Sequence, residues 1–344
     1  MVGALRTTRG ALAGSAGTWA FLGVVLALLL VLLGPRAASD PSFFVQIVIY
    51  GLANGAIYAL IALGYTMVYG IIELINFAHG DVFTLGAFFA LPLIAAFGLK
   101  EDVSSGPGVY VILLVVALIV MLLTGTLNVV IERVAYRPLR NAPRLAPLIT
   151  AVGMSFILEG LMYMWQGANN VHFPDLLPSG RISLGGSASI GAKDLIVIAL
   201  AIVLVIVLTT FVNNSKLGKA MRATAQDRDA AQLMGVNINR TIAATFFIGA
   251  VLAGAGGMIF GLYFNTVRFD LGFQSGLFAF TAAVFGGIGN IQGAALGGLF
   301  IGMVKAFSDA YFTSQLTDVW IFSILILVLV FRPTGLLGMR VPEK

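Results

Sequence analysis

Long apolar segments alternate with short polar segments along nearly the whole chain. Most of the apolar segments approach the roughly 20 residues that a helix needs to cross the hydrocarbon core of a bilayer. With boundaries good to a few residues, the candidate spans are 18–34, 44–70, 81–98, 109–131, 146–166, 193–212, 241–264, 277–292, 296–312 and 319–331. The pair on either side of Gln292 and the last span are the least distinct, so we predict eight to ten spans. This pattern predicts an all-α polytopic membrane protein.

The composition excludes a water-soluble globule. Apolar residues make up 59% of the chain and charged residues 10%, and the mean hydropathy is +0.99. A soluble domain, by contrast, carries about 25% charged residues. Glycine is abundant, at 41 of 344 residues, and glycine-rich apolar helices approach one another closely in lipid, where packing drives helix association.

The positions of lysine and arginine predict the orientation, because cytoplasmic loops carry an excess of both. With the N-terminus inside, 14 of the 20 basic residues fall in the cytoplasm. Five fall outside and one lies within a span: Arg36, Lys100, Arg181, Lys193 and Arg268 outside, and Lys305 in the span. We therefore expect both termini in the cytoplasm. The excess of basic residues in the cytoplasmic loops accounts for the net charge of +5. We therefore expect membrane lipid rather than nucleic acid as a partner.

The first 43 residues allow two interpretations. Two arginines, an apolar segment from Gly17 to Gly34 and the small residues 37–39 fit a secretory signal peptide. The apolar core, however, is longer than the ~7–15 residues usual in such peptides. We favour an uncleaved additional span, and divide the chain into an N-terminal extension (1–43) and a main domain (44–344).

Residues that commonly carry catalysis or bind metals are scarce. The chain has no cysteine, which excludes disulfides and thiolate chemistry. Its two histidines, His79 and His172, give no metal-ligand spacing with the scattered carboxylates. There is also no G-x-x-x-x-G-K-[ST] loop to hold nucleotide phosphates. We expect no catalytic, metal-binding or cofactor-binding residue, so any ATP-driven step requires a separate ATPase polypeptide.

The long cytoplasmic loop, residues 213–241, contains the stretch LGKAMRATAQDRDAAQLMGVNINR (217–240). Good helix formers dominate it, and Gly235 stands where a glycine would end the helix. Small or apolar side chains recur at helical spacing on one face: Ala220, Ala223, Ala230, Ala231 and Met234. Such a helix could lie on the membrane surface or dock in a groove of a partner. A face made of alanines favours docking, because it binds a membrane only weakly.

Within this loop, DAAQLMG (229–235) resembles the E-A-A-x-x-x-G loop of bacterial ABC-transporter permease subunits, with Asp229 in place of the glutamate. In those proteins the loop supplies a coupling helix that seats in a cleft of the cytoplasmic ATPase. The resemblance implies an ATPase-coupling set in this chain: Arg222, Asp229, Ala230, Ala231 and Gly235.

Four further blocks, in the same order, resemble the high-affinity branched-chain amino acid permease subunits of the LivH type. They are GLANGAIYALIALGYTMVYGIIELINFAHGD (51–81), IERVAYRPLR (131–140), FTAAVFGGIGNIQGAALGG (280–298) and FRPTGLLG (331–338). The resemblance runs from about residue 44 to the end and leaves the first 43 residues as an addition.

This second resemblance implies an ABC-importer permease fold in the bacterial plasma (inner) membrane. It also implies two cytoplasmic ABC ATPase subunits, a second related permease subunit and an extracytoplasmic substrate-binding protein as partners. Relatives that carry urea or short-chain amides share the same blocks, so the substrate stays open at this point, as does a homodimeric or heterodimeric membrane core.

Ionisable side chains within spans are costly, and each is therefore a candidate for function. Lys305 and Asp309 are four residues apart on a predicted helix and can neutralise one another, so we interpret them as a structural pair. Glu159 has no partner that the sequence reveals, and we interpret it as a packing or surface residue. The remaining group is the polar cluster from Glu73 to Asp81.

This cluster lies in IIELINFAHGDVFTLG (71–86), where Asn76, Gly80 and Asp81 favour helix ends over helix centres. We predict a broken or re-entrant connection here, with Gly80 at the bend and Asp81 capping a helix that starts at Val82. Backbone of this kind at membrane depth commonly lies beside the substrate path of transporters. His79 titrates near neutrality and is a candidate for a proton relay.

A second break is predicted in FGGIGNIQGAALGG (285–298). Both breaks have a glycine shortly after an asparagine, which suggests an internal repeat or a chance match. We take Asn76, His79, Gly80 and Asn290 as candidates for the translocation path.

Three functions remain open on these grounds. The favoured one is the non-catalytic permease subunit of an ATP-driven importer for branched-chain amino acids. The second is a proton- or ion-coupled carrier or channel that uses Glu73, His79 and Asp81. The third is a structural membrane anchor for a cytoplasmic complex.

Overall fold

The computed structural model describes residue 35 and residues 38–73, 75–99, 106–140, 142–143, 145–186 and 188–338. The predicted first span, 18–34, lies outside the described residues. All structural statements below refer to the described part of the chain.

Helices account for most of the described chain, and eight of them are long and apolar enough to cross a membrane. The helices are α2 (Pro41–Ile72), α3 (Ala78–Ala96), α4 (Pro107–Ile131), α5 (Leu145–Gln166), α6 (Ala192–Asn214), α7 (Lys216–Gln226), α8 (Arg228–Leu233), α9 (Ile238–Phe264), α10 (Leu271–Gly286), α11 (Ile291–Tyr311) and α12 (Thr317–Phe331). The π-helical turn η1 (Glu132–Tyr136) and the 3-10 turn η2 (Arg137–Leu139) continue the C-terminal end of α4. The 3-10 turn η3 (Ser314–Leu316) directly precedes α12. The prediction of an all-α polytopic membrane protein is confirmed.

One predicted span is displaced along the sequence. The span expected at 277–292 is α10, which begins at Leu271 and ends at Gly286. It has 16 residues, fewer than any of the eight spans, the shortest of which joins η3 to α12 and has 18. The polar and glycine residues at 287–290 end this helix earlier than the apolar pattern alone suggested.

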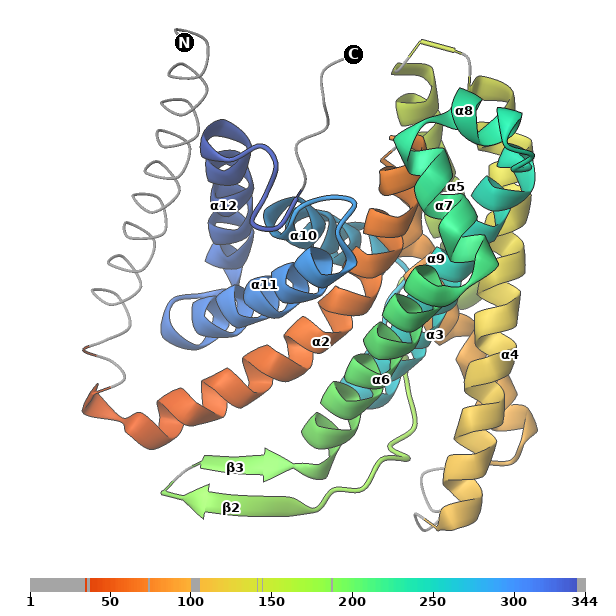
Figure 1. The fold of residues 1–344 in the computed structure, drawn as a ribbon. Helices are drawn as coiled ribbons and strands as arrows, with labels where there is room; N and C mark the ends of the chain where they lie inside the picture. Colours follow the sequence, from red (N-terminus) through yellow and green to blue (C-terminus); the bar gives the residue numbers. More distant parts are fainter. Residues whose placement is uncertain are drawn as a thin grey trace, which may run out of the picture.

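The bundle has a buried centre and an exposed periphery. Helix α2 packs along α11 (Figure 1) and against α9, and α9 also packs on α3 and α4. In the most apolar window of α2, 78% of the residues are buried, compared with 17% for the span that ends in α12. The peripheral helices α4, α5, α6 and α12 therefore present long apolar faces to the surroundings, as expected of helices in contact with lipid.

Glycines allow the central helices to approach closely. A Cβ atom on Gly298 of α11 would overlap the backbone of Ala59 in α2, and one on Gly302 would overlap Gly55. On the other side of the centre, a Cβ on Gly257 of α9 would overlap the carbonyl of Phe83 in α3. Small residues at these contacts bring the helix backbones together, which is how helices associate in lipid.

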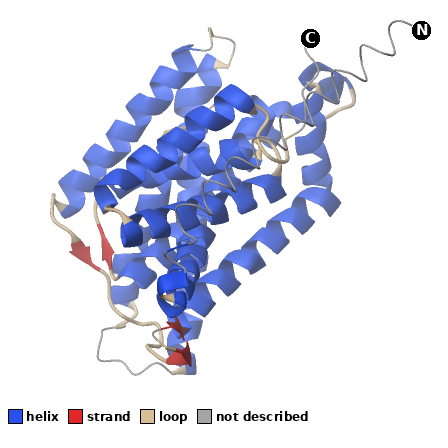
Figure 2. Ribbon diagram, turned by 90° about the vertical axis from the view of Figure 1, so that its left-hand side faces the viewer, coloured by secondary structure: helices blue, strands red, loops and turns tan. Residues whose placement is uncertain are grey.

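The strands are short and lie outside the helix bundle (Figure 2). Strands β2 (Arg181–Gly185) and β3 (Ala188–Gly191) form an antiparallel hairpin that pairs Arg181 with Gly191. Strands β1 (Val171–His172) and β4 (Thr266–Val267) form a second antiparallel pair. The hairpin leads directly into α6, whose other end leads into α7 and α8. The hairpin and the α7–α8 unit therefore lie at opposite ends of the bundle (Figure 1).

Candidate functional site

The first interruption of the helices lies between α2 and α3, where a break was predicted. Helix α2 ends at Ile72, and Glu73 follows in the left-handed conformation, at φ 54°. Helix α3 begins at Ala78, so residues 73 and 75–77 are the described part of the connection. This segment is called the first break below.

Two details of the prediction are wrong. Asp81 does not cap a helix starting at Val82, and Gly80 does not form the bend, because both lie within the first turns of α3. The backbone N–H of His79 donates to the Asn76 carbonyl at 3.0 Å, and α3 begins at Ala78, four residues before the predicted start at Val82. The N-cap position belongs to Phe77, which makes no side-chain capping bond.

Side chains from distant elements hold the first break. The Tyr136 hydroxyl in η1 donates to Oδ1 of Asn76 at 2.6 Å, and the Ser155 hydroxyl in α5 donates to Oδ2 of Asp81. Asn76 is 1% exposed and Asp81 is fully buried. A buried amide and a buried carboxylate need such partners, because an unpaired polar group in an apolar interior is costly.

His79 is enclosed by protein. The side chain is fully buried, and its ring lies 4.9 Å from the ring of Tyr65. A Cβ atom on Gly64 would overlap the imidazole, so only a glycine leaves room for it. Neither ring nitrogen makes a hydrogen bond of regular geometry to the described residues. His79 is therefore packed against Tyr65 and Gly64 in the interior of the bundle.

Gly80 has a packing role. A Cβ atom there would overlap the Gly272 carbonyl of α10 and come within 2.9 Å of the Gly276 Cα. The close approach of α10 to the start of α3 thus requires glycine on both helices. Helix α10 in turn ends at the second interruption.

The second break, residues 287–290, connects α10 to α11 as predicted. Gly287 and Gly289 have positive φ angles of 109° and 90°. Asn290 is the N-cap of α11: its Oδ1 accepts from the Gly293 N–H at 3.1 Å, and its Nδ2 donates to the Leu337 carbonyl at 2.8 Å. Asn290 therefore belongs to a contact with the C-terminal segment.

The two breaks lie next to each other. A Cβ atom on Gly70, in the last turn of α2, would lie 3.2 Å from the Cα of Gly289. Among the path candidates, the structure thus groups Asn76, His79 and Gly80 on one connection and places Asn290 on a neighbouring one.

The predicted single helix of the long loop is two helices, α7 and α8. Asp227 separates them, because its Oδ1 accepts from the N–H groups of Asp229 and Ala230, both at 3.0 Å, and so caps a new helix. The predicted end at Gly235 is confirmed. Gly235 has φ 84°, its N–H donates to the Gln232 carbonyl, and the Val236 N–H donates to the Ala231 carbonyl, the pattern of a glycine C-cap.

The predicted coupling residues differ in their surroundings. Asp229, Ala230 and Gly235 are exposed on α8 and at its end, whereas Ala231 is buried. Arg222 does not belong to the same surface, since its guanidinium donates to the carbonyls of Val212 and Asn213 at the C-terminal end of α6.

Two residues that the sequence did not single out, Leu233 and Arg228, stand out around α8 together with Met234 of the predicted docking face. Leu233 and Met234 are 88% and 84% exposed, which is unusual for large apolar side chains side by side. Arg228 donates to the Ile71 carbonyl at 3.1 Å, and so connects α8 to the last turn of α2, two residues before the first break. Sequence spacing contains no signal for this bond, because the two residues are far apart in the chain.

A depression of about 630 Å³ lies beside α8, and three arginines are among the residues that line it. Arg140, one of these, pairs with Glu132 and donates to Oδ1 of Asn239 at 2.7 Å. Burial lowers the pKa of the Arg140 guanidinium from its usual value, and the nearby Glu132 opposes this effect. Arg137 and Arg228 line the same depression.

Lys305, Asp309 and Glu159 are the other ionisable residues that we expected within spans. Lys305 and Asp309 form the predicted ion pair at 2.7 Å, and the Thr317 hydroxyl donates to the same carboxylate. Glu159 is half-buried on α5 and borders a depression of about 470 Å³.

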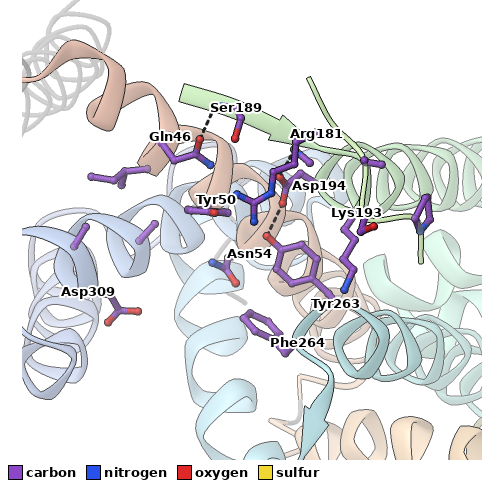
Figure 3. Close-up of a pocket in the computed structure, with 18 of the residues that line it drawn as sticks. Gln46, Tyr50, Asn54, Arg181, Ser189, Lys193, Asp194, Tyr263, Phe264 and Asp309 are labelled. Atoms are coloured by element: carbon purple, nitrogen blue, oxygen red, sulfur yellow. Dashed lines mark hydrogen bonds between the residues drawn. The ribbon is translucent and has the colours of Figure 1, made fainter. Parts of the chain in front are cut away.

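A cavity of about 690 Å³ lies at the opposite end of the bundle, against the β2–β3 hairpin (Figure 3). We call it the hairpin cavity. Helices α2, α6, α9 and α11 and both strands contribute side chains to it, among them Gln46, Tyr50 and Asn54 on one face of α2. The sequence did not reveal it, because its lining comes from widely separated segments.

The chain matches a family described as the permease component of branched-chain amino acid transport systems, over residues 47–331. It is 43% identical over 308 residues to the high-affinity branched-chain amino acid transport system permease protein BraD of Pseudomonas aeruginosa, covering 88% of this chain and 98% of that protein. It is 42% identical, with the same coverage, to LivH of Escherichia coli. A probable LivH of Methanocaldococcus jannaschii is 26% identical over 295 residues, which are 81% of this chain and 88% of that protein. No solved structure matches the chain.

The sequence resemblance to LivH-type permeases is therefore confirmed over most of the chain, and the eight apolar helices agree with it. The protein is a multi-pass protein of the bacterial inner membrane. Its relatives are transport permeases rather than enzymes. It belongs to the family of permease components of branched-chain amino acid transport systems.

Proposed function

We propose that this chain is the membrane-spanning subunit of an ATP-driven importer for branched-chain amino acids. The names of its relatives at 41–43% identity support the substrate class. In this proposal residues 44–344 form the permease domain, residues 1–43 are an extension with an additional span, and both termini and the α8 end face the cytoplasm. Separate ATPase subunits hydrolyse ATP, a second related permease completes the membrane core, and an extracytoplasmic binding protein delivers the substrate.

The observation that carries the coupling role is the exposed apolar pair at the end of α8. Leu233 and Met234 project from a short, doubly capped helix, where no described residue covers them. Large apolar side chains in this position suit insertion into a cleft of a partner. The other coupling residues proposed for the same contact are Asp229, Ala230, Ala231 and Gly235, whereas Arg222 supports the unit by binding the end of α6.

A physical connection from α8 to the first break gives this contact a route into the membrane. A displacement of α8 moves Arg228, and Arg228 holds the carbonyl of Ile71. The first break then continues to Asn76, which Tyr136 holds from η1. In our proposal the two breaks border the translocation path, with Asn76, His79, Gly80 and Asn290 at or beside it.

A proton-coupled carrier is the second candidate. Such a carrier would need titratable groups that water can reach. His79 and Asp81 are fully buried, and they pack so closely against Gly64 and Gly272 that a Cβ atom on either glycine would overlap them. These observations favour the ATP-driven importer over a proton path through this cluster. A structural anchor that moves no solute remains the third candidate.

The test is transport by the assembled complex in proteoliposomes. The chain is co-expressed with the ATPases, second permease and binding protein of its own system, and uptake of radiolabelled leucine, isoleucine and valine is compared with that of urea and acetamide. We expect uptake of the three amino acids only with ATP on the ATPase side. Uptake driven by an ion gradient in this chain alone would refute the proposal, as would preferred uptake of urea.

The variant Leu233→Asp tests the coupling contact in the same preparation. We expect it to reduce co-purification of the ATPases by at least about tenfold, because a charge would have to be buried in the cleft. Ile182→Asp, which makes the same change at the exposed hairpin, is the matched control and should co-purify normally. Equal co-purification of both variants would reject α8 as the docking element.

A further inference from the structure

The hairpin cavity contains charged groups of both signs, and most of them already have partners. Lys193 pairs with Asp175 at 2.7 Å and donates to Oδ1 of Asn265 at 3.0 Å. Asp309 pairs with Lys305 at 2.7 Å. These groups are neutralised within the protein.

One cation and one anion remain without a counter-charge. Among the described residues, Arg181 of β2 makes no hydrogen bond or ion pair with its side chain, and Figure 3 shows it reaching from the strand toward Tyr50. Asp194, in the first turn of α6, is 5% exposed. Its carboxylate accepts from the Tyr263 hydroxyl at 2.6 Å and from the Gly191 N–H at 2.9 Å, but no cation of the described chain pairs with it.

The Asp194 carboxylate lies in the first turn of α6, where the helix N-terminus and two neutral donors stabilise it, and it keeps room for a cationic partner because none of the described basic side chains pairs with it. A guanidinium has the planar geometry that binds a carboxylate through two parallel hydrogen bonds. A ligand with one carboxylate and one ammonium group would complete both sites in the same cavity.

Apolar and aromatic side chains form another part of the lining, beside neutral polar ones such as Gln46 and Asn54. Phe43 and Ile47 of α2, Phe264 of α9 and Ala306 and Ala310 of α11 line the cavity. A volume of about 690 Å³ lies within the range of roughly 300–1,000 Å³ usual for small-molecule sites, which combine an apolar lining with a few placed polar groups.

We propose that the hairpin cavity binds an α-amino acid with an aliphatic side chain, as a station on the outer side of the path. Arg181 binds its carboxylate, Asp194 its ammonium group, and the apolar wall its side chain. The inference rests on the proposed import of branched-chain amino acids, which it deepens by assigning a substrate site within this subunit. The same charge pair occurs in phosphatidylethanolamine headgroups, so the experiment separates the two sources.

Cysteine labelling tests the site directly, because the chain contains no cysteine of its own. Ala310→Cys places one thiol in the lining of the cavity, and Ser183→Cys places one on β2 outside it. Both variants are reconstituted in the complete complex, in vesicles of phosphatidylcholine and phosphatidylglycerol. The rate of reaction with a membrane-impermeant maleimide is then measured with and without leucine.

Leucine should slow labelling at position 310 by a factor of 1 + [leucine]/Kd, about elevenfold at ten times the Kd. It should leave position 183 unchanged. The analogues 4-methylpentanoate and 3-methylbutylamine, which lack the ammonium or the carboxylate, should protect far more weakly. Arg181→Gln and Asp194→Asn should each abolish protection, whereas Arg268→Gln, whose side chain pairs with Asp270 outside the cavity, should preserve it.

The possible failures can be told apart. If the wild-type complex imports leucine but leucine leaves labelling at position 310 unchanged, the site is refuted and the proposed function stands. If leucine protects but is not imported, the site stands and the proposed function fails. The amino acid site would be overturned if protection of position 310 required phosphatidylethanolamine and not leucine. It would also be overturned if either analogue protected this position as well as leucine does.

Discussion

The two helix breaks lie side by side, yet different forces hold them. The first break is held by side chains of distant elements: Tyr136 on Asn76, Ser155 on Asp81 and Arg228 on the Ile71 carbonyl. The second is held mainly by backbone contacts.

In the second break, the Leu336 N–H donates to the Phe285 carbonyl at 2.8 Å and the Leu337 N–H to the Gly286 carbonyl at 2.9 Å. Gly287 packs against Gly335 and Gly338. A connection fixed by side chains can exchange partners when its neighbours move, whereas a glycine-lined backbone contact has no such alternatives. The comparison indicates that the first break is the adjustable one and the second the fixed support beside it.

Gly287→Val should give the largest effect, because it attacks the fixed support. The residue has φ 109°, and a Cβ atom would overlap the backbone of Gly338. Strain and overlap together should cost at least about 3 kcal/mol, and we expect little folded protein in the membrane. Gly108→Val, in open space at the start of α4, is the control. Normal amounts of a stable Gly287→Val protein would show that the second break is not rigid.

The sequence predicted the existence of both breaks, because asparagine and glycine interrupt apolar helices whatever their surroundings. It misplaced Asp81 and Gly80, because their roles depend on a hydroxyl from α5 and on the glycine surface of α10. The periodicity of the alanines predicted one helix across the long loop and missed the cap at Asp227 that divides it.

Other features had no local signal in the sequence. The Arg228 bond joins residues far apart in the chain, and the hairpin cavity is lined by segments from α2 to α11. Such contacts depend on how the helices pack, which hydrophobic periodicity does not specify. The spans themselves were predicted well, because their length and polarity are imposed by the bilayer.

Arg228→Gln should have the next largest effect, and on coupling more than on folding. Loss of a charge-assisted hydrogen bond costs about 1.5–3 kcal/mol, enough to change a coupling equilibrium by about tenfold or more. We expect ATP hydrolysis by the assembled complex to continue while amino acid uptake per ATP falls. Arg240→Gln makes the same change in the same loop, at an exposed position, and should behave as wild type. A parallel fall of hydrolysis and uptake would contradict a role in transmission.

Tyr136→Phe tests the side-chain attachment of the first break inside the bundle. It leaves Oδ1 of Asn76 buried without its donor, at a cost of about 1–3 kcal/mol. We expect a lower thermal unfolding midpoint of the detergent-solubilised protein. Tyr110→Phe on α4, an exposed position, is the matched control. An unchanged midpoint would mean that this hydrogen bond does not stabilise the resting conformation.

Asn290→Ala should give the smallest effect, although it removes two hydrogen bonds of the second break. The residue is half-buried, so water can replace its bonds to Gly293 and Leu337, and loss of an N-cap costs about 1 kcal/mol. The backbone bonds of Leu336 and Leu337 remain in place. We therefore expect a small fall in the unfolding midpoint and nearly normal uptake, with Asn214→Ala at the exposed end of α6 as control. A loss of uptake larger than that of Arg228→Gln would reverse the comparison, since it would make the second break the one whose side chain controls transport.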